Sequence, residues 1–151
     1  MKNRYLAYSR QHIDKSDIGA VNRALRSDII TRGNIVREFE STIADKFNSK
    51  YAVTVNSASS ALLLACQAIN LKKNDIMWTS SITYAASANC GLLCQATVDF
   101  LDIDHETKNI SISKLKYKLQ IAKKNQKLPK VVIIVHLAGN PINLVEINKL
   151  S

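Results

Sequence analysis

Three serines stand at a junction where a short β-branched run stops and an apolar, helix-forming run begins. The run Tyr51–Val55 predicts a strand, and residues 58–69 predict a helix. Ser57 is placed to cap that helix, and Ser59 and Ser60 lie in its first turn. The first N–H groups of a helix lack an intrahelical partner and lie at the positive end of its dipole. With the serine hydroxyls they suit a phosphate group; a simple helix cap at Ser57 is the alternative interpretation.

Polar and aromatic side chains also follow the other predicted strands. Tyr84 comes after the strand at 75–79, where it is able to stack on a planar ligand whose phosphate the serines hold. A core or surface role is the alternative for this ring. Asp102 and Asp104 are typical of a turn that caps the next segment. His136 ends the run VVIIV and is either a polar site residue or a structural histidine. Ligands bind beyond the carboxyl ends of parallel strands, so each of these residues is a candidate.

Strands and helices alternate along the chain, and this alternation has to position those side chains. Strands are expected at residues 51–55, 75–79, 97–103 and 131–135, and helices after a cap at Asp14 or Ser16, around residues 35–47, over residues 58–69, 84–94 and 113–124, and from about Leu144. The order predicts an α/β fold with a mostly parallel sheet and helices on both faces. The continuous run VVIIV is typical of a strand buried on both sides.

The net charge of +9 is concentrated in one lysine-rich segment. No acidic residue lies between Glu106 and Glu146, whereas eight lysines do: Lys108, Lys114, Lys116, Lys118, Lys123, Lys124, Lys127 and Lys130. The segment contains no Arg, and Tyr117 is its only aromatic residue, so it lacks the usual groups for base reading and base stacking. We expect a solvated helix face and loop, with an anionic partner as the alternative, and no nucleic acid.

The three cysteines, Cys66, Cys90 and Cys94, form an odd set without the spacing of a disulfide framework. No His or Asp ligand lies near them, so they predict buried apolar packing rather than a metal site. No apolar run approaches the ~18 residues of a membrane span. The first residues lack the apolar segment of a secretory signal. We therefore expect one cytoplasmic domain of 151 residues without a membrane partner.

Five stretches, in order, resemble a known family: TRGNIVREFE, NSASSALLLA, DIMWTSSITYAASAN, VDFLDIDHETKNIS and VVIIVHLAGNP. From Tyr8 to Leu150 the chain is similar to the start of the DegT-type sugar-nucleotide aminotransferases. The resemblance implies the fold type I (aspartate aminotransferase-like) architecture, pyridoxal 5'-phosphate (PLP) as cofactor and a homodimer. The opening AYSRQHIDKSDI and the lysine-rich loop most resemble enzymes of the pseudaminic acid pathway. Those enzymes move an amino group from glutamate to C4 of a UDP-linked 4-keto-6-deoxy-N-acetylhexosamine, which implies a nucleotide sugar and glutamate as substrates.

The resemblance also implies roles for the residues at the first two strand ends. The segment Ser57–Ala58–Ser59 matches the part of the family that holds the cofactor phosphate through backbone N–H groups and a hydroxyl. Ser59 stands where the family usually has Thr, and Ala58 stands where many members have Gly. The aromatic residue that matches Tyr84 stacks on the pyridine ring, where Phe is common.

One further match lies near the active-site entrance, and the chain departs from the family at two places. Thr31 and Gly33 match a T-x-G loop at the entrance of the active site, and His136 stays a candidate for the same region. Ser81 stands where a Pro is usual before the stacking aromatic, which we expect to loosen Tyr84. The pair Met77–Trp78 occupies a strand that normally carries small β-branched residues, which predicts a repacked sheet surface.

Transamination needs groups that the resemblance places after Ser151. A lysine has to form the Schiff base with the cofactor, and a carboxylate has to keep the pyridine nitrogen protonated. The family carries both after the segment that matches VHLAGNP. We therefore expect residues 1–34 to form an N-terminal helix and entrance loop, and residues 35–151 an incomplete PLP-binding large domain. The expected function is that of an N-terminal fragment without activity of its own. A non-catalytic remnant or a partner-binding module is the alternative, and another keto sugar stays open.

Overall fold

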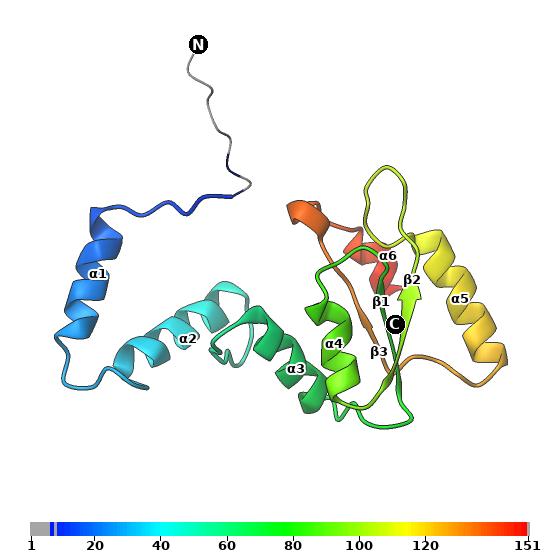
Figure 1. Ribbon diagram of the computed structural model, residues 1–151, viewed down its shortest axis with the longest axis horizontal. Helices are drawn as coiled ribbons and strands as arrows, with labels where there is room; N and C mark the ends of the chain where they lie inside the picture. Colours follow the sequence, from blue (N-terminus) through cyan, green and yellow to red (C-terminus); the bar gives the residue numbers. More distant parts are fainter. Residues whose placement is uncertain (1–6, 8, 151) are drawn as a thin grey trace, which may run out of the picture. The chain divides into compact units, whose positions relative to one another are not determined.

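The computed structural model describes residues 7 and 9–150 (Figure 1). The chain divides into two compact units, one that ends at Thr54 and one that starts at Val55. None of the described helices is long and apolar enough to cross a bilayer.

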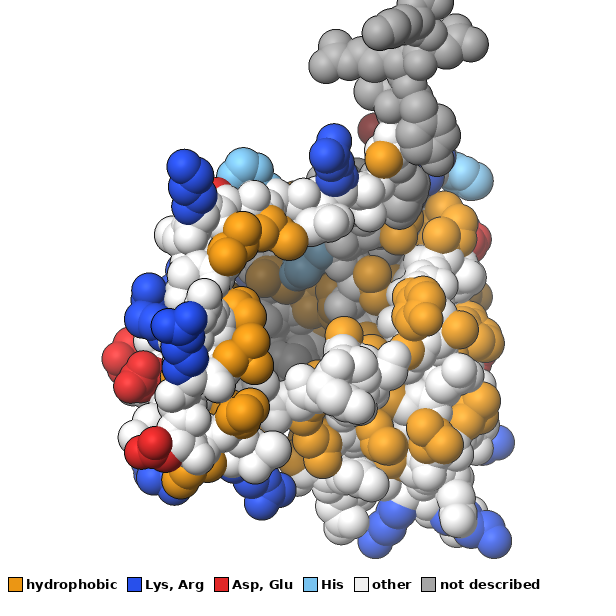
Figure 2. Space-filling view, turned by 60° about the vertical axis from the view of Figure 1, so that its left-hand side comes forward, with side chains coloured by type: hydrophobic (Ala, Val, Ile, Leu, Met, Phe, Trp, Pro, Cys, Tyr) orange, Lys and Arg blue, Asp and Glu red, His pale blue; other side chains and the backbone are white. Residues whose placement is uncertain are grey.

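The first unit holds helices α1 (Lys15–Leu25) and α2 (Asn34–Lys46). Asp14 caps α1 in a capping box, since its carboxylate accepts the N–H groups of Ser16 and Asp17 while the Asp17 carboxylate accepts the Asp14 N–H. The apolar faces of both helices are exposed, and Ala44 is the one buried residue in the part of this unit that the structure describes. Figure 2 shows that hydrophobic side chains are exposed on the side of the molecule that this view presents.

The second unit contains a parallel sheet with helices on both faces, as the sequence predicts (Figure 1). Strands β1 (Ile76–Ser80), β2 (Thr97–Leu101) and β3 (Val131–Ile133) stand in the order β2-β1-β3, with helices α3 (Ala58–Ala68), α4 (Ala86–Leu93), α5 (Ile112–Lys124) and α6 (Leu144–Asn148) and a short 3-10 turn, η1 (Leu137–Gly139). The strands meet in register with Trp78 opposite both Asp99 and Val132.

Two hydrophobic clusters cover the two faces of the sheet. Met77 is fully buried against side chains of α3 and α4, which include Cys66 and Cys90. Trp78, only 3% exposed, points to the other face and packs with residues of α5 and α6, which include Leu115. Successive residues of a strand face opposite sides, so the unusual Met77–Trp78 pair supplies one large side chain to each cluster.

The predicted strand at residues 51–55 is absent, and that prediction was wrong. A strand needs a hydrogen-bonded neighbour, and none of the strands that the structure describes pairs with this segment. The Thr54 N–H instead donates to the Glu40 carboxylate over 2.8 Å. A β-branched composition is therefore not by itself evidence of a partner strand.

The outer edge of β2 is closed by side chains at Phe100. The Phe100 N–H donates to Asp99 Oδ1 over 2.7 Å, and the Phe100 carbonyl accepts the Lys118 ammonium over 2.7 Å. Lys118 also pairs with Asp99 at 2.6 Å and lies 4.8 Å from the centre of the Trp78 ring. The Leu101 carbonyl accepts the Ser81 N–H on the side of β1, so the N–H and carbonyl of the preceding residue, Phe100, face the outer edge of β2. Because both Phe100 groups are already hydrogen-bonded to side chains, they are not open to an added strand.

Candidate cofactor site

The first turn of α3 is organised by a chain of side-chain hydrogen bonds. Ser57 has extended backbone and its hydroxyl oxygen accepts the Ser60 N–H over 3.2 Å, so it is the N-cap. The Ser60 hydroxyl donates to Asn56 Oδ1 over 2.7 Å. The Ser57 and Ser60 hydroxyl oxygens lie 3.1 Å apart, and since the Ser60 proton is committed to Asn56, the Ser57 hydroxyl is the donor between them.

At the N-terminal end of α3, these bonds leave one hydroxyl and two N–H groups without a hydrogen-bond partner among the described residues. The Ala58 N–H, the Ser59 N–H and the Ser59 hydroxyl make no hydrogen bond to any residue that the structure describes. Ala58 and Ser59 are exposed. Three donors at the positive end of a helix dipole match the oxygens of a phosphate dianion. The residues present therefore fit the phosphate of PLP, and Ser59 rather than Ser57 is the hydroxyl that remains available.

Tyr84 lies in the loop that connects β1 to α4. Its side chain is 79% exposed. Helices α3 and α4 lie beside each other against the same face of the sheet (Figure 1). Ser59 belongs to the first turn of α3, and Tyr84 comes two residues before α4 begins. The first turn of α3 and the loop that carries Tyr84 thus lie at the same end of the sheet, beyond the carboxyl ends of the strands.

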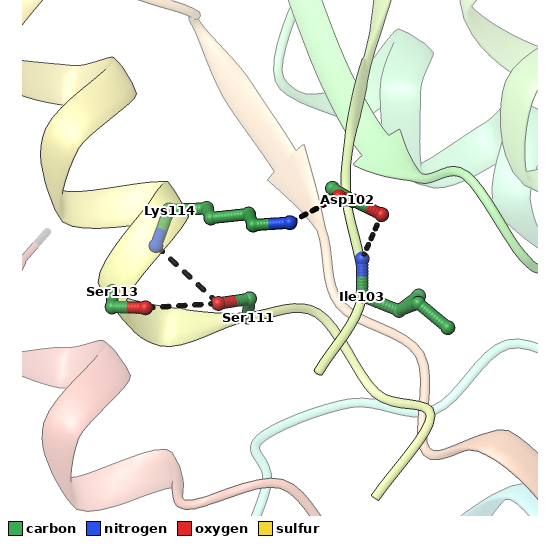
Figure 3. Close-up of polar contacts among 5 residues, drawn as sticks. All are labelled: Asp102, Ile103, Ser111, Ser113 and Lys114. Atoms are coloured by element: carbon green, nitrogen blue, oxygen red, sulfur yellow. Dashed lines mark hydrogen bonds and ion pairs between the residues drawn. The ribbon is translucent and has the colours of Figure 1, made fainter. Parts of the chain in front are cut away.

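Asp102 is engaged in local structure at the end of β2 (Figure 3). Its carboxylate forms an ion pair with Lys114 of α5 and accepts the Ile103 N–H over 2.8 Å. The Lys114 ammonium first, and then the Ile103 N–H, hold the pKa of Asp102 below its ordinary value of 3.8. Figure 3 also shows Ser111, which caps α5 by accepting the Lys114 N–H. Asp102 therefore ties the sheet to α5.

Asp104 forms the turn that the sequence indicates. Its Oδ1 accepts the N–H groups of Glu106 and Thr107 and the Thr107 hydroxyl, at 2.9–3.1 Å. The bond from the Thr107 N–H is the largest cause that lowers the pKa of Asp104. The Oδ1 atom of this carboxylate is thus used by the chain itself, as in an Asx turn.

His136 is exposed at the end of the β3 segment, and its ring orientation is fixed. Its Nδ1 accepts the Ile142 N–H over 3.1 Å, so the neutral ring carries its proton on Nε2. The sequence reasoning missed the residue that holds this loop, Asn109. Its buried side chain accepts the Leu137 N–H over 2.9 Å and donates to the Asn140 carbonyl over 2.9 Å. A lone Asn in a polar stretch carries no sequence signal for this role.

Thr31 and Gly33 lie in the first unit, in the loop before α2, and the structure does not place them relative to Tyr84 or Ser59. Gly33 has an ordinary φ of −71°. A Cβ at this position would lie 2.4 Å from the Ile29 carbonyl oxygen, so a close backbone approach explains the glycine. The sequence predicts the residue correctly as part of a loop but not the reason for it.

Half of the eight lysines in the lysine-rich segment form ion pairs, and two of the three cysteines are buried. Four of the lysines form ion pairs with carboxylates from elsewhere: Lys114 with Asp102, Lys116 with Glu146, Lys118 with Asp99 and Lys130 with Asp75. Cys66 and Cys90 are buried thiols, and burial first, then a hydrogen bond with Cys90, raises the pKa of Cys66 to about 12. No cluster of metal-ligating residues occurs in the described part of the chain.

Comparison with known proteins defines the class. Residues 11–151 match the DegT/DnrJ/EryC1/StrS aminotransferase family, so the chain belongs to that family. A UDP-4-amino-4,6-dideoxy-N-acetyl-β-L-altrosamine transaminase of Campylobacter jejuni is 38% identical over 146 residues, which cover 97% of this chain and 38% of that enzyme. The chain thus spans well under half the length of the curated relatives it matches.

Solved structures share the fold. A GDP-4-keto-6-deoxymannose-3-dehydratase with a trapped PLP-glutamate geminal diamine is 31% identical, with a TM-score of 0.87 over 97% of this chain and 38% of that one. A GDP-4-keto-6-deoxy-D-mannose-3-dehydratase from E. coli with bound hydrated PLP is 32% identical, with a TM-score of 0.84 over 94% and 36%. The fold predicted from the sequence, the N-terminal part of a fold type I large domain, is confirmed by this likeness.

Proposed function

We propose that this chain supplies the phosphate-binding and ring-stacking part of a PLP site. One observation carries the proposal: α3 starts with the two N–H groups and the Ser59 hydroxyl unused, beside the loop that presents Tyr84. Ser57 caps the turn, and Ala58 and Ser59 donate to the phosphate. PLP, when bound, supplies an electron-withdrawing ring that stabilises negative charge at the amino-acid Cα.

The proposed reaction is transfer of an amino group from glutamate to a keto sugar nucleotide. The proposed acceptor carbon is C4 of a UDP-4-keto-6-deoxy-N-acetylhexosamine, as supported by the likeness to the Campylobacter jejuni transaminase. A homodimer and a cytoplasmic location belong to the same proposal, as does the predicted division into residues 1–34 and 35–151. Dehydration of a keto sugar is a second candidate, favoured by the likeness to the E. coli dehydratase. In a protein that joins these residues to the family's lysine and carboxylate, an amino group in the product, seen by mass spectrometry, distinguishes transfer from dehydration.

Binding of pyridoxamine 5'-phosphate tests the site. This amine form is the suitable probe because the aldehyde of PLP would react with exposed lysines anywhere on the chain. In calorimetric titration we expect saturable binding with one site per chain, at least about tenfold tighter than binding of pyridoxamine, since the phosphate makes charge-assisted hydrogen bonds. Equal affinity for the two compounds would contradict the phosphate site and favour a non-catalytic module.

We further infer that these 151 residues alone do not convert glutamate, because none of their lysines lies in a motif that matches the Schiff-base lysine of the family. The expected result is no protein-dependent formation of pyridoxamine 5'-phosphate or 2-oxoglutarate after PLP and glutamate are added, relative to a mixture without protein. Protein-dependent formation of pyridoxamine 5'-phosphate and 2-oxoglutarate would overturn the inference. The binding experiment is independent of that outcome.

A further inference from the structure

Tyr84 lacks the proline that usually precedes it, yet the loop that carries it is hydrogen-bonded at both ends. At the strand end, the Ser81 N–H donates to the Leu101 carbonyl over 2.8 Å, and the hydroxyl oxygen of the buried Ser80 accepts the Ile82 N–H over 3.3 Å. A proline at position 81 has no N–H and could not make the first of these bonds. The loop therefore exchanges a covalent restraint for a hydrogen bond.

At the helix end, one residue binds the loop at the ring-bearing position and at the residue before it. Ser87 is only 7% exposed and lies in the first turn of α4. Its N–H donates to the Tyr84 carbonyl over 2.9 Å, and its hydroxyl lies 3.0 Å from the Thr83 hydroxyl. The cap residue of α4, Ala85, offers no side-chain bond. The Thr83–Ser87 pair is thus the side-chain connection between the loop and the helix.

From these contacts we propose that the Thr83–Ser87 hydroxyl pair positions Tyr84 for stacking on the cofactor ring. The proposal rests on the proposed PLP site. The Tyr84 ring is largely exposed and makes no ring contact with another residue that the structure describes, so the direction of the ring depends on the backbone that carries it. A backbone fixed before binding spares the ligand the entropy of ordering the loop. Thr83 and Ser87 are positioning residues, since neither needs to touch the cofactor.

A matched pair of variants tests the role of the hydroxyl. Thr83→Val keeps the size and branching of threonine but removes the hydroxyl, whereas Thr83→Ser keeps the hydroxyl. We expect Thr83→Val to weaken binding of pyridoxamine 5'-phosphate by about three- to tenfold, a range typical of one lost hydrogen bond. Thr83→Ser should bind as the unsubstituted chain does. Inorganic phosphate, followed by NMR titration of the Ala58 and Ser59 amides, should bind equally to all three proteins.

A second substitution separates positioning from a general loss of structure. Ser87→Ala should weaken pyridoxamine 5'-phosphate as much as Thr83→Val does, and the double variant should be no worse than either, because both remove the same contact. Unchanged affinity in Thr83→Val, or equal weakening of the phosphate and the pyridoxamine compound, overturns the positioning role while the PLP site stands. No phosphate-dependent binding by the unsubstituted chain overturns the PLP site and, with it, this inference.

Discussion

Gly91→Val is expected to destabilise the sheet-containing unit by about 3 kcal/mol or more. Overpacking a close-packed interior costs about 1–3 kcal/mol, and the valine would clash with two neighbouring side chains. Gly91 lies in α4 where the helix packs on β1 and β2. A Cβ there would lie 2.5 Å from Met77 Cε, 2.9 Å from Met77 Sδ and 2.8 Å from Val98 Cγ2. Met77 is fully buried, and Val98 is partly buried and stiff because it is β-branched, so relief of both contacts requires the helix or the sheet to shift.

A double-mutant cycle in urea denaturation checks the cause. Met77→Ala alone should cost about 2–5 kcal/mol through the cavity it leaves. In the double variant the new methyl groups occupy that cavity, so its loss of stability should be at least 1 kcal/mol smaller than the sum of the two single losses, which is roughly the size of coupling between contacting residues. Gly19→Ala in α1 is the control, since its Cβ would meet only an Arg23 nitrogen at 3.4 Å. Additive losses would refute the proposed steric conflict.

The contact between Met77 and Gly91 illustrates how much of the fold the sequence predicts. Alternating strands and helices predict a parallel sheet covered on both faces, because periodicity reports which side of an element is apolar. The departure at Met77–Trp78 predicts repacking. That Met77 fits only because residue 91 lacks a side chain could not be predicted, since contacts between distant residues leave no trace in local periodicity. Residues 51–55 failed for a related reason, because a strand also depends on a partner elsewhere in the chain.

In the candidate site, too, the sequence predicts the types of residue but not the partners to which they bond. The hydroxyls at positions 57–60 predict a helix start that suits a phosphate. Which hydroxyl remains free depends on Asn56, whose side chain takes the Ser60 proton. Similarly, Ser81 was expected to loosen Tyr84, yet its N–H bonds to Leu101 at the end of the adjacent strand. In both places the decisive partner is known only once the backbone is known.

The assignment of hydroxyls leads to a second large effect, on cofactor affinity. Ser59→Ala is expected to weaken binding of pyridoxamine 5'-phosphate by about ten- to a hundredfold, because a hydrogen bond to a charged group contributes about 1.5–3 kcal/mol. Ser59→Thr restores the hydroxyl with the residue usual in the family and should bind as the unsubstituted chain does. Calorimetric titration of the three proteins under one buffer condition provides the comparison.

Ser57→Ala is the matched control, because the two serines are two positions apart but have different partners. The Ser57 oxygen accepts the Ser60 N–H, so its loss should lower helix stability by about 1 kcal/mol, the usual cost of an N-cap. Affinity should change by less than about threefold, since the Ala58 and Ser59 N–H groups and the Ser59 hydroxyl all remain. If Ser57→Ala instead weakened binding as strongly as Ser59→Ala, the Ser57 proton would have to leave Ser60 when the ligand binds. The phosphate would then be held by both hydroxyls, and the bond to Asn56 would not decide which serine is available.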